Sequence, residues 1–204
     1  MRQNSFNDSI PTELFHLRFL QFFDSSTNSL EGGLSSEVGK LENLRTLNLD
    51  GNLLGGNLRN NQLLKQIPSE IGILSYLSTL ALSKNSFTGV IPPSILNLSN
   101  LEKLQLDDNK LYGEIPAWLF DMEGIKKLYL GGNEMNWNNN VKIVPKCLLS
   151  QLSLKSCKIA GDIPEWISTQ KNIDFLELSD NQVTGRFQFG LLRWKLEVYY
   201  CQIT

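Results

Sequence analysis

The sequence has few of the residues and segments that are typical of nucleic-acid-binding proteins, membrane proteins, metal sites or enzymes. Its 204 residues include one histidine and three cysteines, and nineteen basic against twenty-one acidic residues leave a net charge of −2. A near-neutral chain lacks the electrostatic footprint of a nucleic-acid-binding protein. No window holds eighteen uninterrupted apolar residues, and the first residues, MRQNSFNDSIPTELFH, lack the basic end and apolar core of a secretory signal. We therefore expect no nucleic-acid partner, signal peptide or membrane segment in this chain.

Catalytic and metal sites also lack their usual residues. The cysteines are Cys147, Cys157 and Cys201. They are odd in number and show no C-x-x-C spacing, so we interpret them as small buried side chains and not as zinc ligands or a disulfide framework. His16 has no second histidine to work with, and the neighbouring carboxylates Asp107 and Asp108 should point in opposite directions along a strand and be solvated. The sequence thus predicts no enzyme, cofactor or metal.

What the sequence does contain is a repeat of twenty-four residues. Residues 80–92 read LALSKNSFTGVIP and residues 104–116 read LQLDDNKLYGEIP. One polar position marks every repeat, in two series that are offset by nine residues. The first series includes Asn28 and Asn52, and the second is Asn61, Asn85, Asn109, Asn133, Cys157 and Asn181. Leucines keep fixed offsets around these markers, and L-x-x-L-x-L-x-x-N at this period is the signature of a leucine-rich repeat.

The letters of the repeat have physical roles. Leucines at alternate positions, such as Leu104 and Leu106, face one side of a short strand, and stacking of repeats pairs these strands into a parallel sheet. A column of asparagines inside the coil can satisfy backbone groups that the tight turns remove from water. We therefore expect an α/β leucine-rich repeat solenoid over residues 1–204. It would be a curved right-handed superhelix of about eight repeats, with a parallel β-sheet on the concave face and 3-10 or irregular turns on the convex face.

Two segments depart from the pattern. Residues 49–57, LDGNLLGGN, and 58–66, LRNNQLLKQ, resemble a tandem duplication, so we expect surplus chain near 52–61, extruded as a loop after the strand near Leu47. This loop is either functional or only tolerated. In NEMNWNNNVKIVPK at 133–146, Trp137 replaces the usual glycine, which predicts an irregular turn with Ile143 or Val144 in the core, or alternatively a binding feature. The segment 191–204 is atypical, and no capping unit is visible.

The extended pattern L-x-x-L-x-L-x-x-N-x-L-x-G-x-I-P resembles the plant extracellular leucine-rich repeat over roughly residues 1–190. That subclass occurs in receptor-like proteins, receptor kinases and polygalacturonase-inhibiting proteins. The resemblance implies a fragment of a recognition module at the outer face of the plasma membrane, or a secreted one, in defence or developmental signalling. Its partners would be a peptide, carbohydrate or protein ligand and a co-receptor. A receptor-kinase ectodomain fragment and an inhibitor-like or decoy product remain as alternatives.

The concave face is the expected binding site, because strand residues between the leucines point outward there. The position between the two strand leucines holds Asp24, Asn48, Ala81, Gln105, Tyr129, Ser153 and Glu177. The neighbouring columns add Phe22, Lys103, Lys127 and Phe175 on one side and Asp50, Asp107 and Lys155 on the other. Aromatic side chains dominate interface energetics, so Phe22, Tyr129 and Phe175 are the expected anchors. Asn7 and Asn97 begin N-x-S triplets and are candidate glycosylation sites on exposed turns.

Overall fold

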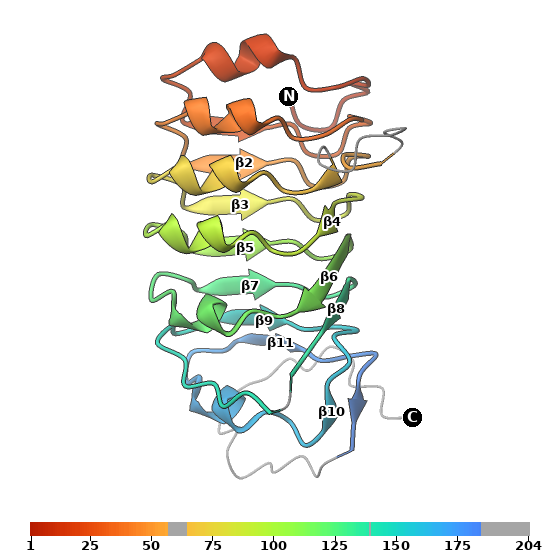
Figure 1. Cartoon of the computed structure of the whole chain (residues 1–204), viewed down its shortest axis with the longest axis vertical. Helices are drawn as coiled ribbons and strands as arrows, with labels where there is room; N and C mark the ends of the chain where they lie inside the picture. Colours follow the sequence, from red (N-terminus) through yellow and green to blue (C-terminus); the bar gives the residue numbers. More distant parts are fainter. Residues whose placement is uncertain (57–64, 139, 185–204) are drawn as a thin grey trace.

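A seven-stranded parallel sheet forms one side of the coil (Figure 1). The computed structural model describes residues 1–56, 65–138 and 140–184. The sheet strands follow chain order and are β1 (Phe22–Asp24), β2 (Thr46–Asn48), β3 (Thr79–Ala81), β5 (Lys103–Gln105), β7 (Lys127–Tyr129), β9 (Gln151–Ser153) and β11 (Phe175–Glu177). Every pair of neighbours is parallel and in register. Each turn of the chain therefore contributes one strand, and the predicted leucine-rich repeat solenoid is confirmed.

Short 3-10 helices form the opposite side of the coil (Figure 1). They are η1 (Thr12–His16), η2 (Ser36–Lys40), η4 (Ser69–Ile73), η5 (Pro93–Asn97), η6 (Ala117–Asp121) and η7 (Glu165–Thr169). Five of these six begin directly after a proline, whose fixed φ and missing N–H suit the first turn of a helix. The recurring Ile-Pro therefore marks the start of five of the six 3-10 helices, and Ser35 takes its place before η2. Among the described residues no α-helix is present.

Two smaller parallel sheets lie where the chain bends between the large sheet and the 3-10 helices. One contains β4 (Thr88–Gly89), β6 (Lys110–Glu114) and β8 (Glu134–Asn136), and the other contains β10 (Ala160–Gly161) and β12 (Gln182–Val183). The repeat glycine occupies the bend, with φ of 86° at Gly89 and 91° at Gly113. Side chains rarely adopt this left-handed region, so the glycine of the repeat has a backbone role.

The strand leucines form one continuous hydrophobic core along the coil. The first strand leucine is fully buried through the middle of the stack, at Leu47, Leu80, Leu104, Leu128 and Leu152. Complete burial of a leucine side chain stabilises a fold by roughly 2 kcal/mol before entropy costs. The equivalent Leu176 is only partly buried. The predicted spine of inward leucines is thus confirmed.

The asparagine column runs inside the coil and joins successive turns. Asn109 is 8% exposed; its Oδ1 accepts from the N–H of Phe87 at 3.0 Å, and its Nδ2 donates to the carbonyls of Leu82 and Leu106 at 2.9 and 3.1 Å. The same pattern holds at Asn28, Asn52, Asn85, Asn133 and Asn181. Cys157 occupies the column but makes one weak contact, from its Sγ to the carbonyl of Lys155 at 3.4 Å.

The turn between β2 and β3 carries the surplus residues. Leu47 pairs directly with Leu80, thirty-three residues later, so no additional strand lies between them. The column passes directly from Asn52 to Asn85, whose Oδ1 accepts from Leu54 N–H at 3.1 Å. The surplus therefore lies in the 52–61 region that the sequence indicates, and its extrusion as a loop stays a prediction. Asn52 and Leu54 keep the regular register, so the surplus follows Gly55; Asn61 lies outside the described residues.

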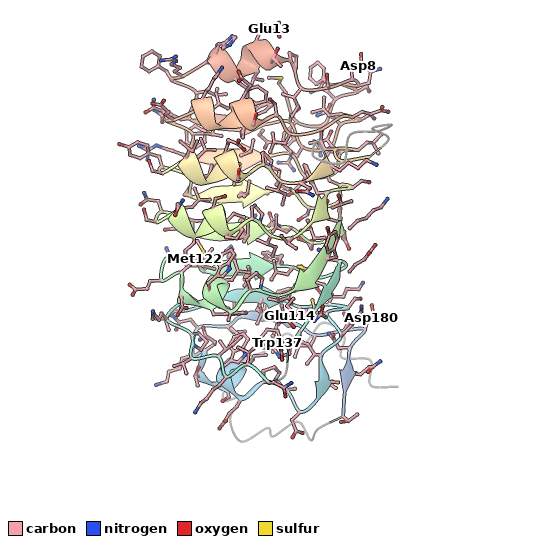
Figure 2. The ribbon with its side chains drawn as sticks, viewed as in Figure 1. Asp8, Glu13, Glu114, Met122, Trp137 and Asp180 are labelled. Atoms are coloured by element: carbon pink, nitrogen blue, oxygen red, sulfur yellow. The ribbon has the colours of Figure 1, made fainter. Side chains whose placement is uncertain are left out.

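The irregular turn after β8 is filled by an aromatic cluster. Trp137 is 8% exposed and lies within the coil near its C-terminal part (Figure 2). Its ring stacks on Trp166 at 5.9 Å and meets Phe120 edge-on at 5.9 Å. Ile143 packs partly against the core, whereas Val144 is 73% exposed. Ile143 was therefore the correct alternative and Val144 the wrong one, and the buried Trp137 adds aromatic contacts to the same turn.

Candidate functional site

The sheet aligns three rows of side chains on the concave face, because every strand pairs in register. The first row reads Phe22, Thr46, Thr79, Lys103, Lys127, Gln151 and Phe175. The middle row reads Asp24, Asn48, Ala81, Gln105, Tyr129, Ser153 and Glu177. The third row follows the second leucine of each strand and includes Asp50, Ser83, Asp107 and Lys155. The sequence-derived columns therefore lie side by side on one surface.

Exposure differs strongly along these rows. Phe22 is 66% exposed on the first strand, which is unusual for a large apolar side chain. Most other members are half-buried, including Asp24, Asn48, Gln105 and Glu177. Ala81 and Ser153 are buried, at 1% and 3% exposure. The expectation that Ser153 presents its side chain to a partner is therefore wrong.

The burial of Ser153 follows from its neighbours. The ring of Tyr129 on β7 meets the ring of Phe175 on β11, with centroids 6.1 Å apart, so the two aromatics approach each other across β9. The hydroxyl of Tyr129 also hydrogen-bonds Gln151 of β9, and Ser153 Oγ donates to Glu177 Oε2 at 2.7 Å. Burial raises the pKa of the Tyr129 phenol, with Asp107 and Asp174 adding to the effect. The two rings form one apolar surface above β9.

Lys103 and Lys127 stand next to each other in the first row, in register on β5 and β7. Both side chains are half-buried. The ion pairs of the described residues involve Lys40, Lys126, Lys146 and Lys155, so neither of the two row lysines is neutralised by one. Like charges directly across a pair of strands repel each other. This part of the concave face is therefore locally basic.

A carboxylate pair lies in the third row, with Asp50 after β2 and Asp107 after β5. Asp50 accepts from Ser83 N–H at 2.6 Å, and Asp107 accepts from the hydroxyl of Ser83. Burial raises the pKa of Asp50 to about 6, against the hydrogen bond from Ser83, and the charge of Asp107 adds to the rise. Burial likewise raises the pKa of Asp107. The expectation of a fully solvated pair at 107 and 108 is wrong for Asp107, while Asp108 is exposed.

The acidic side chains at the two ends of the middle row are held by serines. Asp24 accepts from the N–H and hydroxyl of Ser26 at 3.0 and 2.7 Å. Burial acts to raise the pKa of Asp24, but these hydrogen bonds and the charge of Arg2 outweigh it and leave the pKa below its ordinary value. Glu177 accepts from Ser153 and, at 3.3 Å, from Ser179. Hydrogen bonds from neighbouring serines therefore fix the orientation of both carboxylates in the unbound protein.

Sequence reasoning missed the connections within these rows. It placed Asp50 and Asp107 in one column but did not link them through Ser83, although all three share one offset in the repeat. That shared offset was the available signal. It also missed Gln151, whose role beneath the aromatic pair depends on side-chain directions that a strand pattern does not specify.

The other candidate residues lie away from the sheet. Asn7 and Asn97 are both exposed, Asn97 at the end of η5. Cys147 and Cys157 are free and buried as predicted, and burial raises their pKa values to about 11 and about 12. Cys201 lies outside the described residues. Across residues 1–56, 65–138 and 140–184, no group of three His, Cys, Asp or Glu side chains could hold a metal ion. In that part of the chain, none of the helices has the length and apolarity needed to cross a membrane.

Comparison with known proteins agrees with this architecture. A family model described as leucine rich repeat matches residues 75–135. No curated protein sequence matches the chain significantly. Among solved structures, the chain is similar to the ectodomain of the plant membrane receptor kinase GASSHO1/SCHENGEN3 from Arabidopsis thaliana, in complex with CASPARIAN STRIP INTEGRITY FACTOR 2. The identity is 32%, the TM-score is 0.71, and the match covers 89% of this chain and 24% of that one.

Two further structures show the range of proteins with this architecture. The Arabidopsis receptor kinase HAESA, in complex with the peptide hormone IDA and the co-receptor SERK1, is 27% identical with a TM-score of 0.69, over 89% of this chain and 33% of that one. A plant ice-binding protein is 28% identical with a TM-score of 0.71, over 87% of this chain and 54% of that one. The chain thus spans between a quarter and about half of the length of these proteins. Since one of them binds ice, the fold alone does not assign a function.

Proposed function

The chain is a leucine-rich repeat solenoid similar to plant receptor ectodomains, and on this premise we propose that it is a non-catalytic recognition module. Its ligand is a peptide that lies on the concave face across the strands. The proposal is supported chiefly by the in-register face itself, which combines an exposed phenylalanine, an aromatic pair and unpaired charges. Such amphipathic surfaces suit peptide contacts, because aromatic anchors supply affinity and charged neighbours supply selectivity.

Similar structures support a peptide over other ligand classes. Plant receptors with this fold have been solved in complex with CASPARIAN STRIP INTEGRITY FACTOR 2, with RGF2 and with IDA. The HAESA complex also contains the co-receptor SERK1, and we propose a protein co-receptor as second partner for this chain. By the same similarity, the module acts at the extracellular face of the plasma membrane, in defence or developmental signalling.

Selection from a displayed library of random peptides tests the proposed function. The whole chain serves as bait, and the affinity of each recovered peptide is measured by calorimetry against matched variants. Phe175→Ser and Phe22→Ser should weaken binding at least tenfold, because both side chains lie on the sheet face. Tyr76→Ser changes an aromatic that is 55% exposed outside the sheet and should leave affinity unchanged. Equal losses in all three variants would contradict a concave site.

We also propose that Asn97 carries an N-linked glycan when the chain is secreted. Asn97 ends η5 and is exposed on the side away from the concave face, so a glycan there leaves the proposed site open. Asn7 is exposed too and is the second candidate. Glycosidase treatment of the protein secreted by plant cells should lower its mass. In the Asn97→Gln variant, that decrease should be smaller by the mass of one glycan. An unchanged mass would contradict the proposal.

A further inference from the structure

The basic and aromatic parts of the concave face lie at a defined distance from each other. Lys103 and Lys127 are on neighbouring strands, β5 and β7, and the rings of Tyr129 and Phe175 meet across β9. Strands in a sheet are about 4.8 Å apart, so the midpoint between the lysines lies roughly 7 Å from β9. An extended peptide advances about 7 Å over two residues, and those two residues face the same side. One face of a peptide can therefore reach both features at once.

The two lysines are an unsatisfied pair. Their ammonium groups repel each other, and neither forms an ion pair among the described residues. Lys103 lowers the pKa of Asp50 through its charge, but without a direct contact between the two side chains. A ligand carboxylate placed between the ammonium groups would be attracted to both and would remove their repulsion. An anionic ligand group would therefore give the two lysines the ion-pair partner that they lack among the described residues.

The third row restricts where that anion can lie. Asp107 follows β5, the strand of Lys103, on the other side of the middle row and would repel a carboxylate, as would Asp50, which follows β2 two strands away. The anion is thus directed to the lysine side of the face, while the aromatic pair beside it offers an apolar contact. Charge complementarity therefore selects an acidic peptide segment with one particular spacing.

We propose that the surface over β5, β7, β9 and β11 binds an extended peptide carrying a carboxylate side chain and, two residues away, an aromatic or large apolar side chain. The carboxylate bridges Lys103 and Lys127, and the apolar side chain rests on Tyr129 and Phe175. This inference rests on the proposed function, since it names the class of peptide for the same face. It goes further by fixing the charge of the ligand and the spacing of its two anchors.

Three capped pentapeptides test the inference by calorimetry at low salt. The probe is acetyl-Gly-Asp-Ser-Phe-Gly-amide; the charge control replaces Asp by Asn, and the spacing control exchanges Ser and Phe so that Asp and Phe are adjacent. We expect the probe to bind at least fivefold more tightly than either control, and its affinity to fall as salt is added. Equal affinity of the Asp and Asn peptides would overturn the inference.

Matched lysine variants locate the anion. Lys103→Gln and Lys127→Gln should each reduce the affinity for the Asp probe toward that of the Asn control, with Lys127→Arg retaining most of it. Lys126→Gln is the control, because Lys126 is exposed and pairs with Glu102 at 2.8 Å away from the sheet face. An equal loss in Lys126→Gln would overturn the inference, provided that circular dichroism shows all variants folded.

The outcomes also separate this inference from the proposed function. If the Asp and Asn probes bind equally and both lose affinity in Phe175→Ser, peptide recognition on the concave face stands and the charge assignment fails. If no probe binds at millimolar concentration, the acidic motif is wrong. The library selection still decides, independently, whether the face binds peptides of another kind.

Discussion

At the scale of single residues, the asparagine column shows what one side chain contributes to this coil. An amide has donors and an acceptor on one planar group, so it can connect three backbone groups from two successive turns. Cysteine fits the same space at position 157 but offers only a weak donor. The residue before each marker has a second, less obvious role, because it adopts positive φ in every described repeat, for example 57° at Thr27 and 54° at Asp108.

Replacing Asn109 with alanine tests the column directly. The change leaves the N–H of Phe87 buried without its partner, whereas the carbonyl of Leu82 keeps its hydrogen bond from Asn85 Nδ2 at 3.2 Å. We expect a loss of about 2 kcal/mol in the free energy of unfolding, since one unsatisfied buried group costs about 1–3 kcal/mol. Urea denaturation measures this loss. Lys110→Ala, next in sequence and exposed, is the control, and a similar loss in both variants would contradict the assigned role.

Asp50 makes stability depend on pH. Its folded pKa of about 6 lies above the ordinary 3.8, so the folded state binds the proton more tightly than the unfolded state. The stabilisation of the folded state by this proton is therefore fully present below about pH 4 and is lost as the pH rises through 6. We expect Asp50→Asn, which retains the acceptor for Ser83, to be more stable than the wild type at pH 7 and to show a smaller advantage at pH 4.5.

Urea denaturation at both pH values provides the measurement for Asp50. Asp180→Asn is the matched control, because that carboxylate is 64% exposed and only pairs with Lys155 at 3.5 Å. A pH profile of Asp50→Asn that runs parallel to the wild type would show that Asp50 does not titrate in this range.

At the scale of single elements, the irregular turn after β8 shows that a repeat can keep its fold without some of the residues of the repeat pattern. The strand and the asparagine position are kept, so Asn133 still accepts from Leu111 N–H at 3.0 Å. In this part of the coil, the rings of Trp137, Trp166 and Phe120 pack against one another. Packing of aromatic rings at centroid distances near 5 to 6 Å adds to the area that they bury.

Trp137→Ala should therefore destabilise the C-terminal part of the coil. Removing a buried tryptophan costs about 3–5 kcal/mol, because the lost contacts leave a cavity. Thermal denaturation should show a clearly lower midpoint than in Trp118→Ala, where the side chain is only partly buried. Equal midpoints for the two variants would mean that Trp137 is not a structural residue and would favour its reading as a binding feature.

At the scale of the whole molecule, stability spreads along a line of neighbouring turns and not around one centre. Each turn contacts mainly the turns beside it, as the strand order shows. A surplus in one turn can therefore leave the coil without disturbing the register of the next. This explains why a thirty-three-residue turn between β2 and β3 is compatible with a regular sheet.

Deletion of residues 58–66 should restore a turn of twenty-four residues. The joined sequence would read Asn52-Leu-Leu-Gly-Gly-Asn-Ile-Pro, which matches the regular repeat. We expect a folded protein of equal or slightly higher stability, since shortening a loop lowers its closure entropy by less than about 1 kcal/mol. Circular dichroism and thermal denaturation check the fold. Loss of peptide binding in this folded variant would show that the surplus segment takes part in recognition.

The sequence by itself determined the solenoid, its strand positions and the identity of the three concave rows. It could do so because the same leucine and asparagine offsets recur in successive turns. These offsets fix which residues lie in the core and which lie in the asparagine column. Tertiary structure alone decided which row members are accessible, since Ser153 is covered by side chains from the strands on both sides. It also decided that Ser83 links Asp50 to Asp107 and that the turn after β2 keeps the regular register as far as Leu54. These features depend on contacts between different turns, and the spacing of letters along one chain does not encode the directions of those side chains.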